Sequence, residues 1–121
     1  MKNVTVIETE LRNSLPALAE LINKELGFTP ILELEYMKWG GFVISSGELL
    51  DELGSTLVKT IFSSIKIKIW GELNIINNAI WFNPKLAYEH PNGGSNGTAF
   101  VWRHIGFNLD EKKWITGNKI I

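Results

Sequence analysis

Residues 65–75 read IKIKIWGELNI, and this stretch decides the fold class. Its apolar residues recur at every second position, which is the period of a β-strand with one buried face. The residues expected to face a core are Ile65, Ile67, Ile69, Leu73 and Ile75. The residues expected on the opposite face are Lys66, Lys68, Trp70 and Glu72. The alternation therefore predicts a half-buried strand that carries positive charge and a tryptophan on its other side.

Strands are predicted on both sides of this segment. Residues 31–38 alternate in the same way, and Gly40-Gly41 before Phe42-Val43-Ile44 predicts a hairpin with a two-residue turn. Asn77-Asn78 predicts a further turn, because asparagine tolerates positive φ. The remaining predictions are strands at 79–88 and 98–109, a polar turn at 110–113 and a last strand that begins at Trp114-Ile115.

Helical spacing is found in two other places. Leu11, Leu15, Leu18, Ile22 and Leu26 form one apolar stripe along residues 10–26, with a firm helix starting at the N-cap Ser14 and ending before Gly27. Ser45-Ser46-Gly47-Glu48 has a capping-box pattern and predicts a second helix, whose apolar face runs from Leu49 to Phe62. Val4–Ile7 is expected to form a short strand.

These elements give the order (β)αββαββββ within a single domain, residues 1–121. The simplest arrangement is a two-layer α+β fold: a mainly antiparallel sheet of five to six strands, with two helices on one face. The residues expected to be buried together are Leu15, Leu18, Ile22, Leu53, Leu57, Ile61, Ile67 and Ile69.

Composition excludes several kinds of site. The chain has no cysteine, so it cannot form a disulfide, a thiolate metal site or a thiol nucleophile. The first residues are too acidic for a signal peptide and no apolar run has the length of a membrane span, so we expect a cytoplasmic protein without membrane contact. The net charge is −4 over residues 1–60 and +3 over residues 61–121. Either the acidic residues lie on exposed surfaces of the helices and the lysines on the sheet, or the protein has one acidic face and one basic face that suits an anionic partner.

Residues 79–109 contain both histidines, Trp81, Trp102 and the longest glycine-rich run, residues 92–98. That run lacks the spacing of known phosphate-binding loops, so it is either a hairpin connection or a ligand loop. One hypothesis is a ligand-binding or hydrolytic pocket under residues 89–98, with Trp81 or Trp102 as walls. The polar groups of this pocket are His90, Arg103 and His104, and the two imidazoles act as general base and general acid. The other hypothesis is that these residues are ordinary parts of a hairpin surface.

Outward lysines and a tryptophan suggest a different kind of site. Trp70 lies beside Lys66 and Lys68 on the expected outer side, with Lys85 on a neighbouring strand. Cations next to an aromatic ring suit single-stranded nucleic acid, and they equally suit a protein interface in which tryptophan is a frequent anchor. A third possibility is that Trp70 is simply buried.

The leading hypothesis is a small non-enzymatic protein that binds and occludes a protein partner, as inhibitors, immunity proteins and adaptors do. A small-ligand pocket is the first alternative, and a nucleic-acid accessory role is the second. Neither a catalytic residue nor a metal or other cofactor is assigned. The candidate binding residues are Lys66, Lys68, Trp70, Lys85, His90, Trp102, Arg103 and His104.

Overall fold

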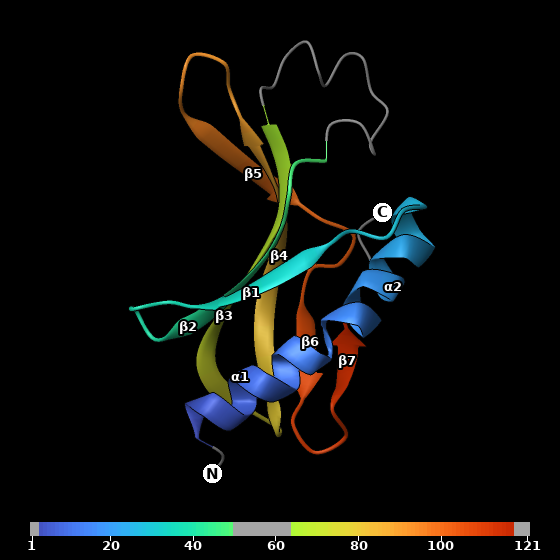
Figure 1. The fold of residues 1–121 in the computed structure, drawn as a ribbon, viewed down its shortest axis with the longest axis vertical. Coiled ribbons are helices and arrows are strands. Elements are labelled where there is room, and N and C mark those ends of the chain that lie inside the picture. Colours follow the sequence, from blue (N-terminus) through green and yellow to red (C-terminus); the bar gives the residue numbers. More distant parts are fainter. Residues whose placement is uncertain (1–2, 50–63, 118–121) are drawn as a thin grey trace.

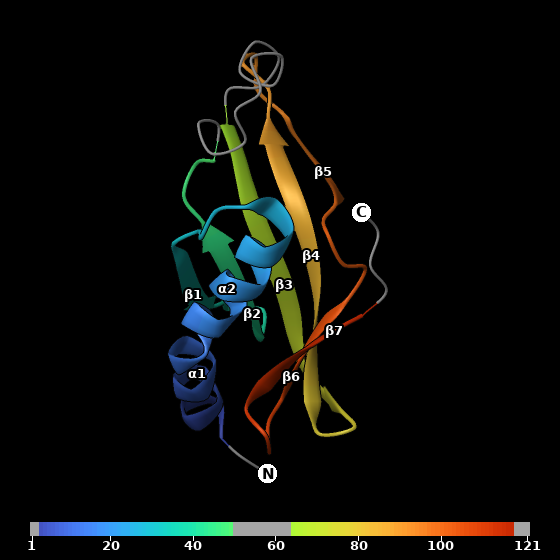
Figure 2. The same ribbon diagram turned by 90° about the vertical axis from the view of Figure 1, so that its right-hand side faces the viewer.

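The computed structural model describes residues 3–49 and 64–117. In these residues two helices, α1 (Val4–Asn13) and α2 (Leu15–Leu26), pack against one antiparallel sheet (Figures 1 and 2). Its strands are β1 (Leu32–Tyr36), β2 (Gly41–Ser46), β3 (Ser64–Ile76), β4 (Ala79–Glu89), β5 (Ser95–Ala99), β6 (Ile105–Asn108) and β7 (Lys113–Thr116). They lie in the order β1-β2-β3-β4-β6-β7, and β5 also pairs with β4. The predicted α+β fold with an antiparallel sheet and two helices is confirmed, although both described helices precede the strands.

The N-terminal segment is helical, so the short strand predicted at Val4–Ile7 is wrong. Asn3 caps α1, and its side-chain oxygen accepts a hydrogen bond from the amide of Val6 at 2.9 Å. Ile7 and Leu11 are buried and lie one helical turn apart, so they form the stripe that packs α1 onto the core. The β-branched residues at the start of α1 favour a strand locally, but the N-cap and this packing outweigh that preference.

Helix α2 begins and ends where the sequence predicts the helix after Ser14. Ser14 is the N-cap of α2 and Pro16 lies in its first turn, where a missing N–H breaks no helical hydrogen bond. Gly27 ends the helix with a left-handed φ of 83°. The helix predicted from Leu49 to Phe62 lies outside the described residues from residue 50 onward. Three of the predicted core residues also lie there, Leu53, Leu57 and Ile61. The five others are buried in one cluster: Leu15, Leu18, Ile22, Ile67 and Ile69.

The predicted hairpin between β1 and β2 is confirmed, but its turn is longer than two residues. Tyr36 pairs with Phe42, and the amide of Gly40 donates to the carbonyl of Met37 at 3.0 Å. Gly40 takes the positive φ of 92° that this turn requires. Gly41 is therefore not a turn residue, and it forms the first position of β2.

The long hairpin of β3 and β4 is the centre of the sheet. Asn77 and Asn78 form its turn with φ of 54° and 59°, as predicted. Inward burial alternates as predicted along the first part of β3, where the fully buried residues are Ile65, Ile67 and Ile69. The register shifts between Gly71 and Ile75, and Ile75 is 37% exposed. Ile75 nevertheless pairs with Ile80, a core residue, so it lies on the inner face as predicted and is only partly exposed beside the turn at residues 77–78.

The sequence predicted one strand at residues 98–109, and this prediction is wrong. These residues divide into β5 and β6, which pair with different halves of the same edge of β4. The link between them buries three consecutive apolar residues, Phe100, Val101 and Trp102. A strand sends alternate side chains to opposite faces, so it cannot bury all three on one side. Pro84 of β4 lies between the two paired halves, where its missing N–H costs no ladder hydrogen bond.

Candidate functional site

The sheet has an outer face, opposite to the face that α1 and α2 cover, and it carries the outward side chains of β2, β3 and β4. Cross-strand register places Lys68 beside Lys85, and Trp70 between Val43 and Asn83. The structure thus brings four of the candidate residues together on one face: Lys66, Lys68, Trp70 and Lys85. None of the four is buried. Trp70 is half-buried, so the possibility that another segment covers it entirely is excluded for this structure.

Lysines gather toward one end of the outer face. Lys68 and Lys85 are direct cross-strand neighbours, an arrangement in which like charges reduce stability. Neither lysine forms an ion pair with any residue in the described part of the chain. The ammonium of Lys85 lies 5.8 Å from the centre of the Trp70 ring, within the range of a cation–π interaction. This end of the face therefore offers positive charge next to an aromatic surface.

Two further tryptophans lie on the outer face because glycines leave room for them. A Cβ at Gly41 would overlap the ring of Trp39. A Cβ at Gly106 would lie 2.9 Å from two carbons of the Trp81 ring. Both rings consequently lie against bare backbone, Trp39 over β2 and Trp81 over its cross-strand partner on β6. Trp39 remains 53% exposed although it is one of the largest apolar side chains.

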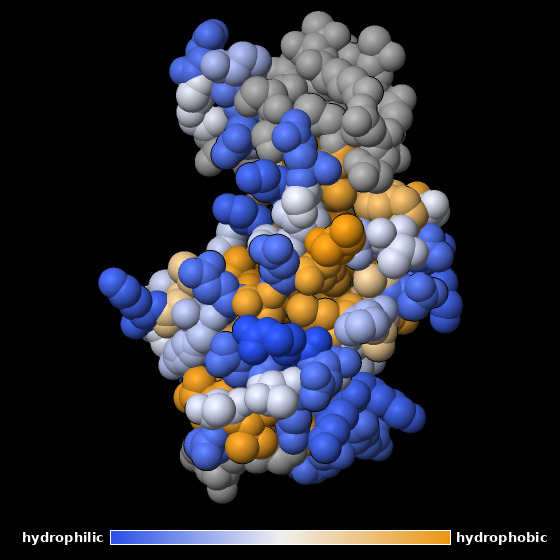
Figure 3. All heavy atoms as spheres, viewed as in Figure 1, coloured by the Kyte–Doolittle hydropathy of each residue, from blue (hydrophilic) through white to orange (hydrophobic). Residues whose placement is uncertain are grey.

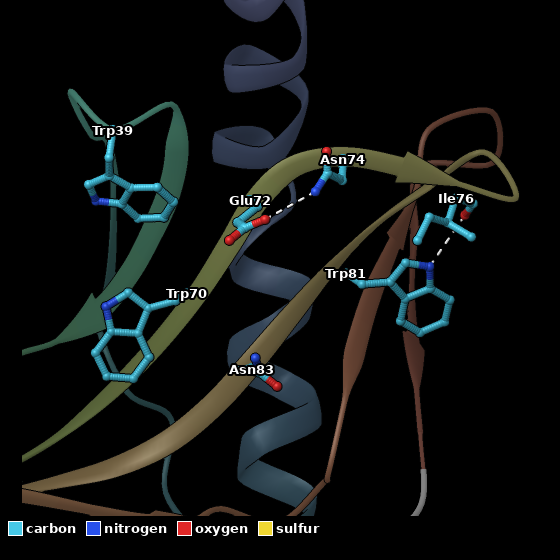
Figure 4. Close-up of a pocket in the computed structure, with 7 residues that line it drawn as sticks. All are labelled: Trp39, Trp70, Glu72, Asn74, Ile76, Trp81 and Asn83. Carbon is cyan, nitrogen blue, oxygen red and sulfur yellow. Dashed lines mark hydrogen bonds between the residues drawn. The ribbon is translucent and has the colours of Figure 1, made fainter.

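A pocket of about 410 Å³ lies among Trp39, Trp70 and Trp81 (Figure 4). It is called the tryptophan pocket below. The polar side chains that line it are Glu72, Asn74 and Asn83. In Figure 4, Glu72 and Asn83 lie between the Trp70 ring and the Trp81 ring. The pocket thus combines aromatic faces with a carboxylate and two amides.

Two hydrogen bonds fix side chains of the pocket. The amide nitrogen of Asn74 donates to the Glu72 carboxylate at 3.0 Å. The indole nitrogen of Trp81 donates to the carbonyl of Ile76 at 3.3 Å. With its only donor engaged in this way, Trp81 presents its ring face rather than an N–H group to a ligand.

The sequence alone did not identify this pocket. The sequence predicts Trp81 only as a wall of a different pocket, under residues 89–98, and it gives no reason to place Trp39 on the outer face. The signal that could have found them is the pair of glycines at outward positions of β2 and β6, because a missing Cβ in a strand interior often marks a close approach. Register across the strands is needed to know which tryptophan each glycine faces.

The two histidines lie far apart. His90 begins the turn of the β4–β5 hairpin, and its carbonyl accepts from the amide of Gly93 at 3.1 Å. His104 precedes β6, whose first residue pairs with Phe82. The two positions are separated by about 23 Å along β4, from a rise of about 3.3 Å per residue. Their imidazoles therefore do not form the acid–base pair that a hydrolytic pocket needs.

The other candidates from this region also have separate places. Trp102 is 4% exposed and packs edge-to-face on Phe100 at 6.1 Å, so its ring is part of the core. Arg103 is exposed next to it. Within residues 3–49 and 64–117, no three histidine, aspartate or glutamate side chains are grouped to hold a metal ion.

A second hollow lies on the helical side of the molecule. It has a volume of about 470 Å³ and is formed by α2 and the segment that leads into β1. Figure 3, viewed as in Figure 1, shows apolar residues gathered near the middle of this side of the molecule. Ile31, which lines the hollow, is 84% exposed.

Neither described helix has the length and apolar character that a membrane span requires.

Comparisons with known proteins add no assignment to this geometry. No protein-family model matches the chain. No curated protein and no solved structure matches it either. The function is therefore inferred from the outer face itself.

Proposed function

We propose that this protein binds another protein through the outer face of its sheet and acts by occluding that partner. The observation that carries the proposal is the tryptophan pocket, whose rings lie on the face that the helices leave open. Large aromatic side chains that stay partly exposed mark interaction surfaces when they lie together.

The arrangement of the rings suits a binding surface. Tryptophan is enriched among the residues that dominate binding energy, because its ring supplies a large contact area with few rotatable bonds. Gly41 and Gly106 hold two of the rings against backbone, so little side-chain freedom remains to be lost on binding. A surface that is ordered before contact is expected to bind more tightly than a mobile one of equal area.

The lysines at the other end of the face favour an acidic partner. Lys66, Lys68 and Lys85 form a positive strip next to Trp70, and cross-interface charge accelerates association and suppresses wrong partners. We expect the partner to present acidic groups opposite this strip. The like-charge pair of Lys68 and Lys85 costs stability in the free protein, a cost that an acidic partner would relieve.

A nucleic-acid role is the second candidate, because the contact of Lys85 with Trp70 is the combination that single strands bind. The carboxylate of Glu72 disfavours it, since a phosphate backbone that crosses the face would pass this negative charge. The alternative of a ligand-binding or hydrolytic pocket under residues 89–98 is less well supported, because its two histidines, His90 and His104, lie apart.

The proposal can be tested by affinity capture from the native host with three versions of the chain. Wild type is compared with Trp39→Ser, which removes an exposed ring of the pocket, and with Ile31→Ser as matched control. Ile31 is also an exposed apolar side chain, but it lies by α2, away from the outer face. Circular dichroism melts first establish that all three versions fold.

The expected result is a protein that wild type and Ile31→Ser retain and Trp39→Ser loses. The proposal is contradicted if Trp39→Ser retains the captured protein as well as wild type does. Retention of nucleic acid instead of protein, abolished by high salt, would favour the second candidate.

A further inference from the structure

We propose that the tryptophan pocket receives an arginine side chain of the protein partner. This inference rests on the proposed function, because it names the group that enters the centre of the same face. It follows from three properties of the pocket: its charge, its aromatic faces and its open shape.

The first property is charge. Among the residues that line the pocket, Glu72 alone carries a formal charge. Its carboxylate accepts one hydrogen bond from Asn74 and keeps further lone pairs for a ligand. The bond from Asn74 also orients the carboxylate, so a donor-rich cation meets a fixed acceptor. An anionic group would meet the same carboxylate and be repelled.

The second property is the set of ring faces. The face of an indole ring carries partial negative charge, and tryptophan is the strongest aromatic partner for a cation. Trp70 already has the ammonium of Lys85 at cation–π distance. The indole N–H of Trp81 is engaged by the carbonyl of Ile76, which leaves its ring as the group that a ligand contacts.

The third property is shape, and it distinguishes arginine from lysine. A guanidinium is flat, so it can stack on an indole ring while its N–H groups form a two-point contact with a carboxylate. In Figure 4 the Glu72 carboxylate lies between the Trp70 and Trp81 rings, so a carboxylate and indole faces line the same pocket. A lysine ammonium is a compact and strongly hydrated charge, so it cannot lie flat on a ring while it makes a two-point contact with a carboxylate. The remaining amide, Asn83, lies beside Trp70 and can accept a further N–H.

The experiment uses a small probe and does not require the partner. N-acetyl-L-arginine amide is titrated into the full chain, and the indole N–H signals of the tryptophans are followed by NMR. N-acetyl-L-citrulline amide is the control probe, since it has nearly the same shape without the charge. Glu72→Gln is the test variant and Glu35→Gln the matched control, an exposed carboxylate on β1 that does not line the pocket.

The expected result is a saturable shift of the Trp39, Trp70 and Trp81 signals by the arginine probe. We expect its affinity to exceed that of the citrulline probe by about tenfold and to fall by a similar factor in Glu72→Gln but not in Glu35→Gln. Equal affinity for the two probes, or no shift at these signals, overturns the inference. Shifts caused only by a single-stranded oligothymidine would overturn it too, in favour of nucleobases.

Failure of this inference is distinguishable from failure of the proposed function. If the arginine probe shows no preference but Trp39→Ser still loses the captured protein, the face binds a partner through other contacts. If Trp39→Ser loses nothing, the docking role itself is wrong.

Discussion

Two glycines on opposite faces of the sheet should respond differently to the same substitution. Gly71 of β3 faces the core, and a Cβ there would overlap the ring of Phe82, which is 2% exposed. Gly106 of β6 faces outward, and a Cβ there would press on the half-exposed ring of Trp81. Neither glycine has a positive φ, so the backbone itself accepts alanine at both positions.

The magnitudes follow from whether the ring can move. Overpacking a filled core costs about 1–3 kcal/mol or more, while replacing glycine in a strand by alanine returns about 0.5–1 kcal/mol. Since Phe82 is enclosed, Gly71→Ala should lower the free energy of unfolding by about 2 kcal/mol. Trp81 can rotate toward solvent at the cost of its hydrogen bond to Ile76, about 1 kcal/mol, so Gly106→Ala should change stability by less than about 1 kcal/mol.

Urea denaturation of both variants, followed by circular dichroism, measures the difference. The indole signal of Trp81 gives a second readout, and it should move in Gly106→Ala. Equal losses of stability in the two variants would refute this assignment of inner and outer faces. A larger loss in Gly106→Ala than in Gly71→Ala would also refute it.

Three other variants test separate parts of the structure. Ile67→Ala removes a fully buried side chain at the centre of β3 and should cost about 2–5 kcal/mol in equilibrium denaturation; a loss below about 1 kcal/mol would mean that the inward face is misassigned. Asn3→Ala removes the N-cap of α1 and should cost about 1 kcal/mol, whereas no change would leave α1 without support from its cap. Lys66→Glu combined with Lys68→Glu should leave the fold intact and slow association with the captured partner, as measured by surface plasmon resonance; an unchanged on-rate and salt dependence would exclude the lysine strip from binding.

The sequence was most informative where one periodicity extended over many residues. The alternation of Ile65, Ile67 and Ile69 correctly predicted the buried face of β3 and the outward position of Trp70. The spacing of Leu15, Leu18 and Ile22 did the same for α2. In both cases local preference and burial agree, so the pattern alone was sufficient.

Predictions failed where tertiary contacts decided the outcome. Val4–Ile7 has strand-forming residues, yet its cap and its packing make it helical. The glycine-rich run, residues 92–98, was predicted to be a loop, but its second half belongs to β5 (Ser95–Ala99), which pairs with β4. The tryptophan pocket depends on register between β2, β3, β4 and β6, and a single sequence does not contain that register. For the same reason the spacing of His90 and His104 could not show how far apart they lie.

Five tryptophans give the outer-face proposal a built-in reporter set. Three of them line the pocket, whereas Trp102 is buried and the indole of Trp114 donates to the carbonyl of Ser14 at 2.9 Å. The most direct test records the indole N–H signals by NMR with and without the captured partner, in the presence of a water-soluble paramagnetic probe.

We expect the partner to shift the Trp39, Trp70 and Trp81 signals and to protect them from the probe, while the Trp102 and Trp114 signals stay unchanged. Unchanged exposure of the three pocket signals in a complex that has demonstrably formed would contradict the assignment of the outer face as the docking surface.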